Sequence, residues 1–577
     1  MAEKILSPGV FQNESDQSLV QRGIQGTATA IVGPTVLGQP FVPTYVTSYS
    51  QFAAKFGETF KSGSYYYEYF TSLAAKDFFQ NGGQTLLVTR IVTSGSTSMS
   101  TYASASVGAF TGTGSSFDIE AITWGNIMDN VSPTVSGSLT SGSAVNVRWE
   151  VTNVNTGSGT FNLTVRAGND NNAQKNYIES WPNLSLDPAL PNYISRVIGD
   201  IKPVYRVDSD GNPFIDQTGS YANASQYIRV KAITTPQIDS IDNNGNYKAT
   251  LYSGSLPALG SGSNSGAFGG GVIATANAQL MNENITTSSI QGFIPADYNA
   301  AFNILANKDE YKYNVLIAPG VGLDCSAAST MISTVEGRGD AIALVGAGIY
   351  GTPINGSTGA VALAAGQSSN YSAAYYPWVQ VYSSNLGKTV WCPPTTVMAG
   401  VFAFNDQVGA EWFAPAGLNR GGIPSVLKAE KRLSQADRDT LYAGNVNPLA
   451  TFPGEGVVVF GQKTLQRKAT ALDRVNVRRL LISLKDYIGQ VSRNLVFEQN
   501  TNVTRNKFLA QVNPYMESVV QRQGLYAYKV VMDGSNNTAD VIDRNQLVGQ
   551  IYVQPTKTAE FIILNFNILP TGATFPA

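Results

Sequence analysis

The sequence predicts a multidomain protein of mixed α/β and α+β class, in which a β-rich insert interrupts an α/β body and extended arms flank both. Three observations predict this. Helical stripes alternate with buried apolar strands on either side of a middle region. The middle region is poor in charge, and its apolar residues follow a period of two. A chain of 577 residues is also too long to fold around a single hydrophobic core, so about three or four domains are expected.

The first part of the chain is expected to form an arm and the first half of the body. Residues 1–25 are interpreted as the arm, with Ser7-Pro8-Gly9 between short apolar pieces. Residues 26–93 begin the α/β body, where a strand and a Gly/Pro turn precede a helix that Asn81-Gly82-Gly83 ends and a buried strand follows. The helical stripe consists of Phe70, Leu73, Ala74 and Phe78.

Residues 94–295 are interpreted as one or two β-rich domains inserted into this body. Only five charged side chains occur in residues 91–160, and the alternation in "AVNVRWEVTNV" and "GTFNLTVRA" predicts hairpins. Polar turn clusters continue to about residue 290.

The body resumes over residues 296–424, where helix and buried strand alternate again. Residues 425–554 are treated as a separate C-terminal domain because their first part, residues 425–510, is rich in basic residues, with 14 Lys or Arg against 7 Asp or Glu. We expect two helices in it, one long and amphipathic, the other over about 503–523 and kinked or restarted at Pro514. The stripe of the first helix consists of Val477, Leu480, Leu481, Leu484, Ile488, Val491 and Leu495.

Residues 555–577 hold a strand near the end of the chain. In "KTAEFIILNFNI", one face carries Glu560 with apolar residues and the other carries Asn565 and Asn567. Such an edge is a template for pairing with another chain. The apolar residues of that face are Ile562, Leu564, Phe566 and Ile568.

The composition argues against most enzyme classes. The chain has no histidine, which removes Ser-His and Cys-His nucleophiles, imidazole metal ligation and the usual general base. Its two cysteines, Cys325 and Cys392, are expected to be free thiols in a reducing cytoplasm. A net charge of −2 argues against a general nucleic-acid binder, and no run is long enough to insert into a membrane. We therefore expect no enzymatic activity, no catalytic residue, no cofactor and no metal.

Two local motifs resemble a phosphate-binding loop and a calcium-binding loop, but neither is complete. "GEGVVVFGQKT" departs from a phosphate loop because Gln462 separates Gly461 from Lys463, and its apolar residues favour a buried strand. The Asp208-Asp210-Asn212 spacing starts like a calcium loop but lacks the glycine and the glutamate that such a loop needs, so a hairpin turn explains it better. A spatial pair of carboxylates stays open from sequence alone.

The basic residues of the C-terminal helices have two interpretations. They form a solvated face, or they form an electrostatic docking surface for an acidic partner. The candidate residues are Arg474, Arg478, Arg479, Lys485, Arg493, Arg505 and Lys507.

Several stretches, taken in order, resemble the tail sheath proteins of contractile-tailed bacteriophages, in particular the large T-even type. The resemblance covers roughly 1–93 and 300–577 and does not extend to 94–295. The stretches that carry it are "SPGVFQNE", "FFQNGGQTLLVTRI", "FAPAGLNRGGI", "LSQADRDTLYAGNVNPL", "DRVNVRRLLISLKDYIG", "VFEQNTNVTRNKF", "NNTADVIDRNQLVGQIYVQP" and "AEFIILNF".

The resemblance implies a mechanical virion protein assembled in the host cytoplasm. Copies would form sixfold rings, stacked helically around the tail tube and joined to baseplate and terminator proteins, without direct contact to nucleic acid. Contraction from a metastable extended state would drive the tube through the host envelope for genome ejection. The α/β body would be the sheath core, the basic residues would face the tube, and the insert would lie outside.

The resemblance also implies that terminal arms join neighbouring subunits. We expect Val10 and Phe11 in the N-terminal arm, together with the apolar face of the C-terminal strand, to serve this purpose. Whether residues 559–568 are donated to a neighbour, or pair with "QIYVQ" at home and receive an arm, stays open. Two other interpretations stay open as well: a non-viral contractile injection system, and a glycan-binding adhesin built on the insert. The host, the helical twist and the contraction ratio are not determined by the sequence.

Overall fold

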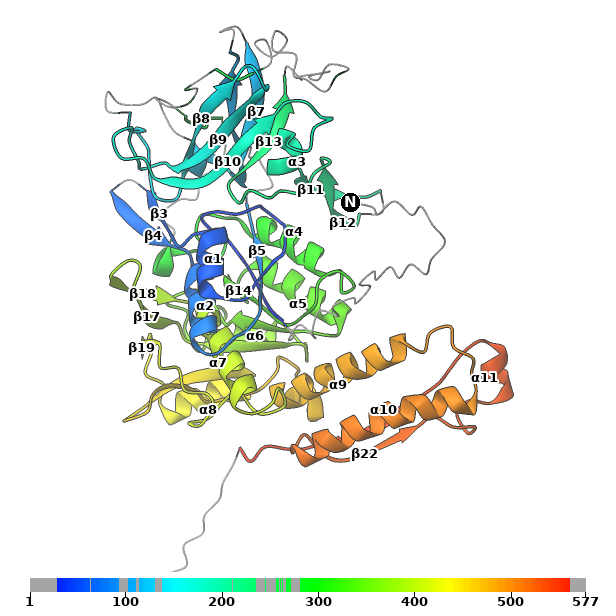
Figure 1. The fold of residues 1–577 in the computed structure, drawn as a ribbon. Helices are drawn as coiled ribbons and strands as arrows, with labels where there is room; N and C mark the ends of the chain where they lie inside the picture. Colours follow the sequence, from blue (N-terminus) through cyan, green and yellow to red (C-terminus); the bar gives the residue numbers. More distant parts are fainter. Residues whose placement is uncertain are drawn as a thin grey trace, which may run out of the picture.

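The molecule has three tiers, which Figure 1 shows as a β-rich domain at the top, an α/β body in the middle and a long helical unit below. The computed structural model describes residues 28–62, 64–92, 102–110, 114–129, 137–209, 211–234, 244, 256–258, 260, 262, 266–270 and 281–560.

An eight-stranded sheet forms the centre of the body and takes strands from both sides of the insert. Its inner strands run parallel, whereas β2 and β21 at the two edges run antiparallel to their neighbours. β1 and β14 are adjacent although more than 270 residues separate them, so the body closes only when both parts of the chain are present. The strands, in sheet order, are β2 (Thr44–Val46), β5 (Leu86–Arg90), β1 (Ala28–Gly33), β14 (Tyr313–Gly322), β15 (Ile342–Gly346), β16 (Ser372–Tyr376), β20 (Val446–Phe452) and β21 (Gly456–Val459).

Helices cover this sheet on both sides. The strand order moves one way from β1 to β5 and the other way from β14 to β15, so right-handed crossovers put α2 and α5 on opposite faces. The expected stripe of α2 is buried and Gly82 has φ +86°, which confirms the predicted helix and its glycine end. The helices of the body are α1 (Tyr49–Phe56), α2 (Phe70–Gln80), α4 (Pro295–Leu305), α5 (Ser326–Arg338), α6 (Ala360–Ala365), α7 (Thr395–Val408) and α8 (Gln435–Ala443).

Two small sheets extend the body at its sides. One is the hairpin of β3 and β4, and the other has the order β18-β17-β19. Their strands are β3 (Thr59–Ser62), β4 (Tyr65–Glu68), β17 (Val379–Ser383), β18 (Lys388–Cys392) and β19 (Val426–Ala429).

The insert is built from antiparallel strands, as its alternation predicts. The expected hairpin is present as β8 and β9, and Phe117 of β7 stacks on Phe161 of β9 at 5.4 Å between two three-stranded sheets. Inside it, Arg166 pairs with Glu150 at 3.0 Å and with Asp170 at 2.7 Å. The elements are β6 (Tyr102–Gly108), β7 (Ser115–Trp124), β8 (Val147–Asn155), β9 (Thr160–Ala167), β10 (Tyr177–Ser185), α3 (Ile194–Ile198), β11 (Lys202–Val207), β12 (Pro213–Thr218) and β13 (Ile228–Ile233).

The C-terminal unit consists of two long helices that cover a two-stranded sheet. Leu480, Leu484 and Val491 of the predicted stripe are buried against α10 and β22 in a second hydrophobic core, separate from that of the body. The elements are α9 (Val475–Arg493), α10 (Asn502–Gln521), β22 (Leu525–Val531), α11 (Ala539–Asp543) and β23 (Gln550–Pro555).

Two details of this region differ from the sequence-based expectations. β20 and β21, which lie beyond the expected boundary at residue 425, complete the central sheet of the body. The C-terminal unit thus begins with α9. Pro514 does not restart its helix, because α10 continues from Asn502 to Gln521 with the proline inside it. The carbonyl that loses its helical partner belongs to Ala510, which is exposed.

Candidate functional site: the C-terminal unit and the root of the terminal segment

The seven basic residues predicted as a docking face do not share one environment. Arg478 and Arg479 are buried, at 3% and 2% exposure, in the first turns of α9, where the body covers the helix. Arg478 lies over the ring of Tyr371 and donates to Asn370 Oδ1 at 3.1 Å. Arg479 binds both carboxylate oxygens of Asp406 on α7. These two side chains therefore join α9 to the body.

Arg505 also acts inside the subunit. It is 6% exposed, and its Nε donates to Asn500 Oδ1 at 2.9 Å, which holds the loop that leads into α10. Lys485, Arg493 and Lys507 are exposed. Lys485 donates to Tyr371 Oη at 3.2 Å, and Arg493 pairs with Asp309 at 3.4 Å with both side chains mostly in solvent. Within the described part of the chain, only these three of the seven present their charged ends at the surface.

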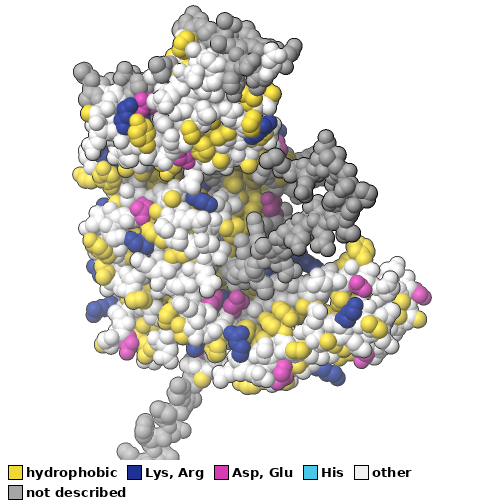
Figure 2. Space-filling view, viewed as in Figure 1, with side chains coloured by type: hydrophobic (Ala, Val, Ile, Leu, Met, Phe, Trp, Pro, Cys, Tyr) yellow, Lys and Arg dark blue, Asp and Glu magenta, His cyan; other side chains and the backbone are white. Residues whose placement is uncertain are grey.

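The visible surface of the C-terminal unit is mixed. Figure 2 shows basic, acidic and hydrophobic side chains interspersed on the coloured part of this face. The loop between α9 and α10 adds two exposed apolar side chains, Val496 at 61% and Phe497 at 101%. The exposure of these two side chains was not predicted. In the sequence they follow directly on the apolar stripe of the long helix, whereas the helix itself ends at Arg493.

Arg474 has a different position, at the root of the terminal segment. Its Nε and Nη2 donate to the two carboxylate oxygens of Glu560 at 2.7 and 3.0 Å. Tyr442 Oη donates to the same carboxylate at 2.7 Å, and Gln462 Nε2 donates to it at 3.1 Å. Burial raises the pKa of Glu560, but the hydrogen bonds from these three side chains outweigh it and hold that pKa below its usual value. We call these four residues the Glu560 cluster.

The residues before Glu560 cross from the C-terminal unit to the body. Thr556 Oγ1 donates to the carbonyl of Gln523 at 2.8 Å, at the turn between α10 and β22. Thr558 Oγ1 accepts from Gln462 Nε2 at 2.6 Å, on the body side. Residues 556–560 are thus held at both ends, and they do not pair with β23.

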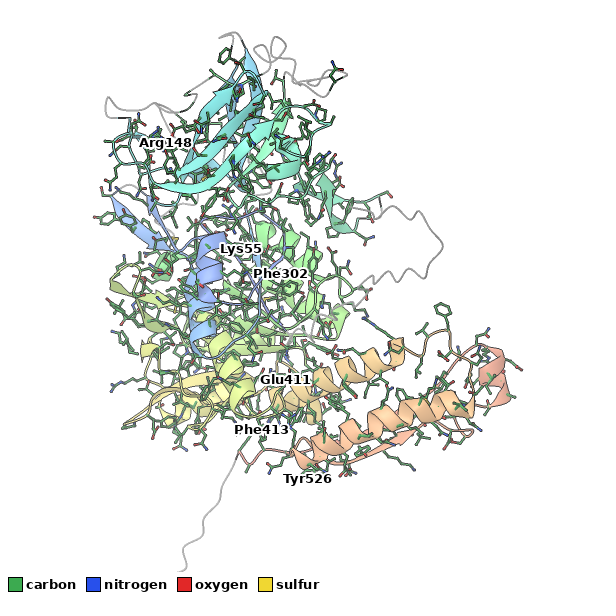
Figure 3. The ribbon with its side chains drawn as sticks, in the orientation of Figure 1. Lys55, Arg148, Phe302, Glu411, Phe413 and Tyr526 are labelled. Atoms are coloured by element: carbon green, nitrogen blue, oxygen red, sulfur yellow. The ribbon has the colours of Figure 1, made fainter. Side chains whose placement is uncertain are left out.

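A groove of about 1060 Å³ lies beside residues 556–560, between the body and the C-terminal unit. Figure 3 shows Phe413 at the foot of the body, above Tyr526 of β22, and both residues line the groove. Aromatic side chains line the groove together with Arg420 and Arg438, neither of which has an ion-pair partner among the described residues. The aromatic lining consists of Trp412, Phe413, Tyr442, Phe460 and Tyr526.

The sheet of β22 and β23 has two open edges among the described residues. Each strand pairs only with the other, and the outward-facing Tyr526 and Tyr552 are 65% and 57% exposed. The opposite face rests on α10 through Leu525 and Met532. A sheet of this kind can accept an added strand from another chain. The predicted arm residues Val10, Phe11, Ile562, Leu564, Phe566 and Ile568 lie outside the described residues.

The sequence comparisons cover this region and the adjoining part of the body. Residues 275–465 match the phage tail sheath protein central domain, and residues 467–569 match the phage tail sheath C-terminal domain, so together they account for half of the chain. The chain belongs to the phage tail sheath family. The resemblance stated from sequence is confirmed, and so is the mixed α/β class.

Individual relatives of this chain support the same family assignment. This sheath-family chain is 40% identical over 194 residues to the tail sheath protein of Vibrio phage KVP40, covering 34% of this chain and 29% of that one. It is 41% identical over 185 residues to the tail sheath protein of Enterobacteria phage T4, covering 32% and 28%. The matches thus span less than a third of these relatives' length.

A solved structure extends the likeness in fold to nearly the whole chain. The crystal structure of a sheath tail protein from Listeria innocua aligns with a TM-score of 0.52 at 10% identity, covering 92% of this chain and 95% of that one. At 10% sequence identity, this alignment is evidence for a shared fold alone.

Among the described residues, no group of three or more Cys, Asp or Glu side chains is arranged to hold a metal ion. No helix in the described ranges is both long and apolar enough to cross a membrane.

Proposed function

We propose that this chain is the repeating subunit of a contractile tail sheath. Copies form stacked sixfold rings around the tail tube, joined to the baseplate and the tail terminator. They contract from a metastable extended state and drive the tube through the host envelope without enzymatic activity or a cofactor. The observation that carries the proposal is the ordered match of both sheath domains over residues 275–465 and 467–569, together with 40% identity over 194 residues to a phage sheath protein.

The terminal arms supply the links between copies in this proposal. The open edges of the β22–β23 sheet are suited to accept strands, and the apolar residues around Val10 and over 562–568 are suited to fill them. Each buried apolar side chain would contribute roughly 1.5–3 kcal/mol before the cost of ordering the arm. The links then hold while other contacts between rings break.

Assembly tests the proposal directly. The purified chain, concentrated and viewed by negative-stain microscopy, is expected to form hollow tubes with sixfold symmetry. A protein that stays monomeric or trimeric under all conditions would rule out the sheath role. Glycan binding by the same sample, without tubes, would favour the adhesin alternative.

We retain the tube-facing role for the exposed basic residues alone. Changing Lys485, Arg493 and Lys507 to Glu is expected to leave self-assembly intact and to weaken loading onto the tube about tenfold at low salt, since exposed pairs contribute about 0.2–1 kcal/mol each. Co-sedimentation with tail tubes measures the loss. The matched control changes Lys55, Lys231 and Lys388, which are exposed elsewhere. Equal loading of both variants would remove the tube-facing assignment.

A further inference from the structure

The Glu560 cluster combines features that a surface ion pair lacks. Arg474 contacts the carboxylate with two nitrogens, which is the strong bidentate geometry. The carboxylate side chain is only 18% exposed, and Gln462 beneath it is 3% exposed. Screening by water and salt is therefore reduced relative to an exposed pair.

The cluster also has a defined place in the chain. Tyr442 lies in the last turn of α8, Gln462 follows β21, and Arg474 precedes α9, so all three donors are attached to the body. Glu560 is the last described residue before the uncharged, apolar segment 561–577. The hairpin partner β23 ends five residues earlier, at Pro555.

We propose that the Glu560 cluster is a latch that fixes the root of the C-terminal segment to the α/β body of its own subunit. Glu560, the residue to which segment 561–577 is joined, is then held in a fixed position on the body. A force applied to that segment is then transmitted to the body through α8, β21 and α9. It does not separate β23 from β22. The mechanical part of this inference rests on the proposed sheath function, because only an assembled neighbour would pull on the segment.

Trypsin cleavage tests the latch without assembly. Lys557 is exposed and is the last Lys or Arg in the chain, so a single cut there releases residues 558–577. A protease must draw several residues on each side of the cut into an extended form, which the latch prevents. Glu560→Gln is expected to speed this cut about tenfold or more, since a charged hydrogen-bonded pair is lost.

Two further variants make the result specific. Glu455→Gln changes an exposed carboxylate in the β20–β21 turn and is expected to leave the rate unchanged. The double variant Glu560→Arg with Arg474→Glu is expected to recover much of the protection. Mass spectrometry of the released peptide gives the rates, and cleavage at exposed Arg432 serves as the internal reference. Equal rates for wild type and Glu560→Gln at Lys557 would overturn the latch.

Microscopy separates the latch from the sheath function. If wild-type protein forms tubes, Glu560→Gln subunits are expected to form fewer and shorter ones while their melting temperature stays close to wild type. Tubes of equal number and length would overturn the mechanical role and leave the sheath function standing. A wild-type protein that forms no tubes would overturn the sheath function and with it the mechanical role, while the trypsin result still decides whether the latch exists.

Discussion

At the scale of single residues, the same residue type serves different purposes in this chain. Arg479 and Arg478 fasten α9 to the body, Arg505 orders a loop, and Arg474 holds Glu560. A guanidinium group suits all these positions because it is planar, always charged and able to bind two oxygens at once. The charge of a residue in the sequence is therefore a poor guide to whether it faces a partner.

Asp77 is the residue for which pH dependence is clearest. It lies on α2 against Gly400 of α7, where an added Cβ would clash with its carboxylate, and burial raises its pKa to about 7 against the weaker opposing effects of Ser425 and Asn81. Because the folded pKa exceeds the unfolded one, this group's stabilising contribution is complete below about pH 4 and is lost as the pH rises through about 7.

Asp77→Asn is accordingly expected to flatten the pH dependence of stability between about pH 4 and 7, which spans up to about 4 kcal/mol for this group. Denaturant midpoints at several pH values measure it. The control Asp439→Asn, on the surface of α8, is expected to keep the wild-type slope. A wild-type slope in Asp77→Asn would contradict the assignment.

At the scale of elements, α9 connects two hydrophobic cores. Its first turns lie in the body, where Val475 and Ile482 are buried, and its later turns pack on α10. The helix is therefore the mechanical joint between the body and the C-terminal unit. Its apolar stripe could be predicted from the 3.6-residue period, whereas the burial of Arg478 and Arg479 could not, since the body covers the polar face of those turns as well.

Truncation of Leu484, which is 3% exposed between α9 and α10, is expected to destabilise the C-terminal unit. Leu484→Ala should lower its free energy of unfolding by about 2–4 kcal/mol through lost burial and the cavity left behind. Hydrogen exchange of α10 amides, compared with those of β14, measures the local effect. Val503→Ala, at a 67% exposed position on α10, is the matched control and should stay within about 0.5 kcal/mol of wild type.

At the scale of the whole molecule, the position of the latch makes two truncations informative. A chain ending at Pro555 retains β23 but loses the latch and the terminal segment, and it is expected to fold its insert and form no tubes. A chain ending at Glu560 keeps the cluster and loses only the apolar segment. It is also expected to form no tubes, because the link to a neighbour is missing. Negative-stain microscopy and circular dichroism decide both, and normal tubes from either chain would refute the arm assignment.

The local elements of this protein are determined by its sequence. Periods of two and 3.6 residues place the β8–β9 hairpin, α2 with its glycine end, and the stripe of α9, because each depends on neighbours along the chain. The buried strand in "GEGVVVF" and the low-charge β insert are determined in the same way.

Only the tertiary structure decided which distant segments meet. The pairing of β1 with β14, the addition of β20 beside β16, and the contact of Glu560 with Arg474 join residues that are from 72 to more than 280 positions apart in the sequence. The one local sign of the last contact was a carboxylate on the apolar face of the strand predicted for residues 557–568. A charge there requires a partner, but periodicity carries no information about which basic residue supplies it, because that depends on packing through space.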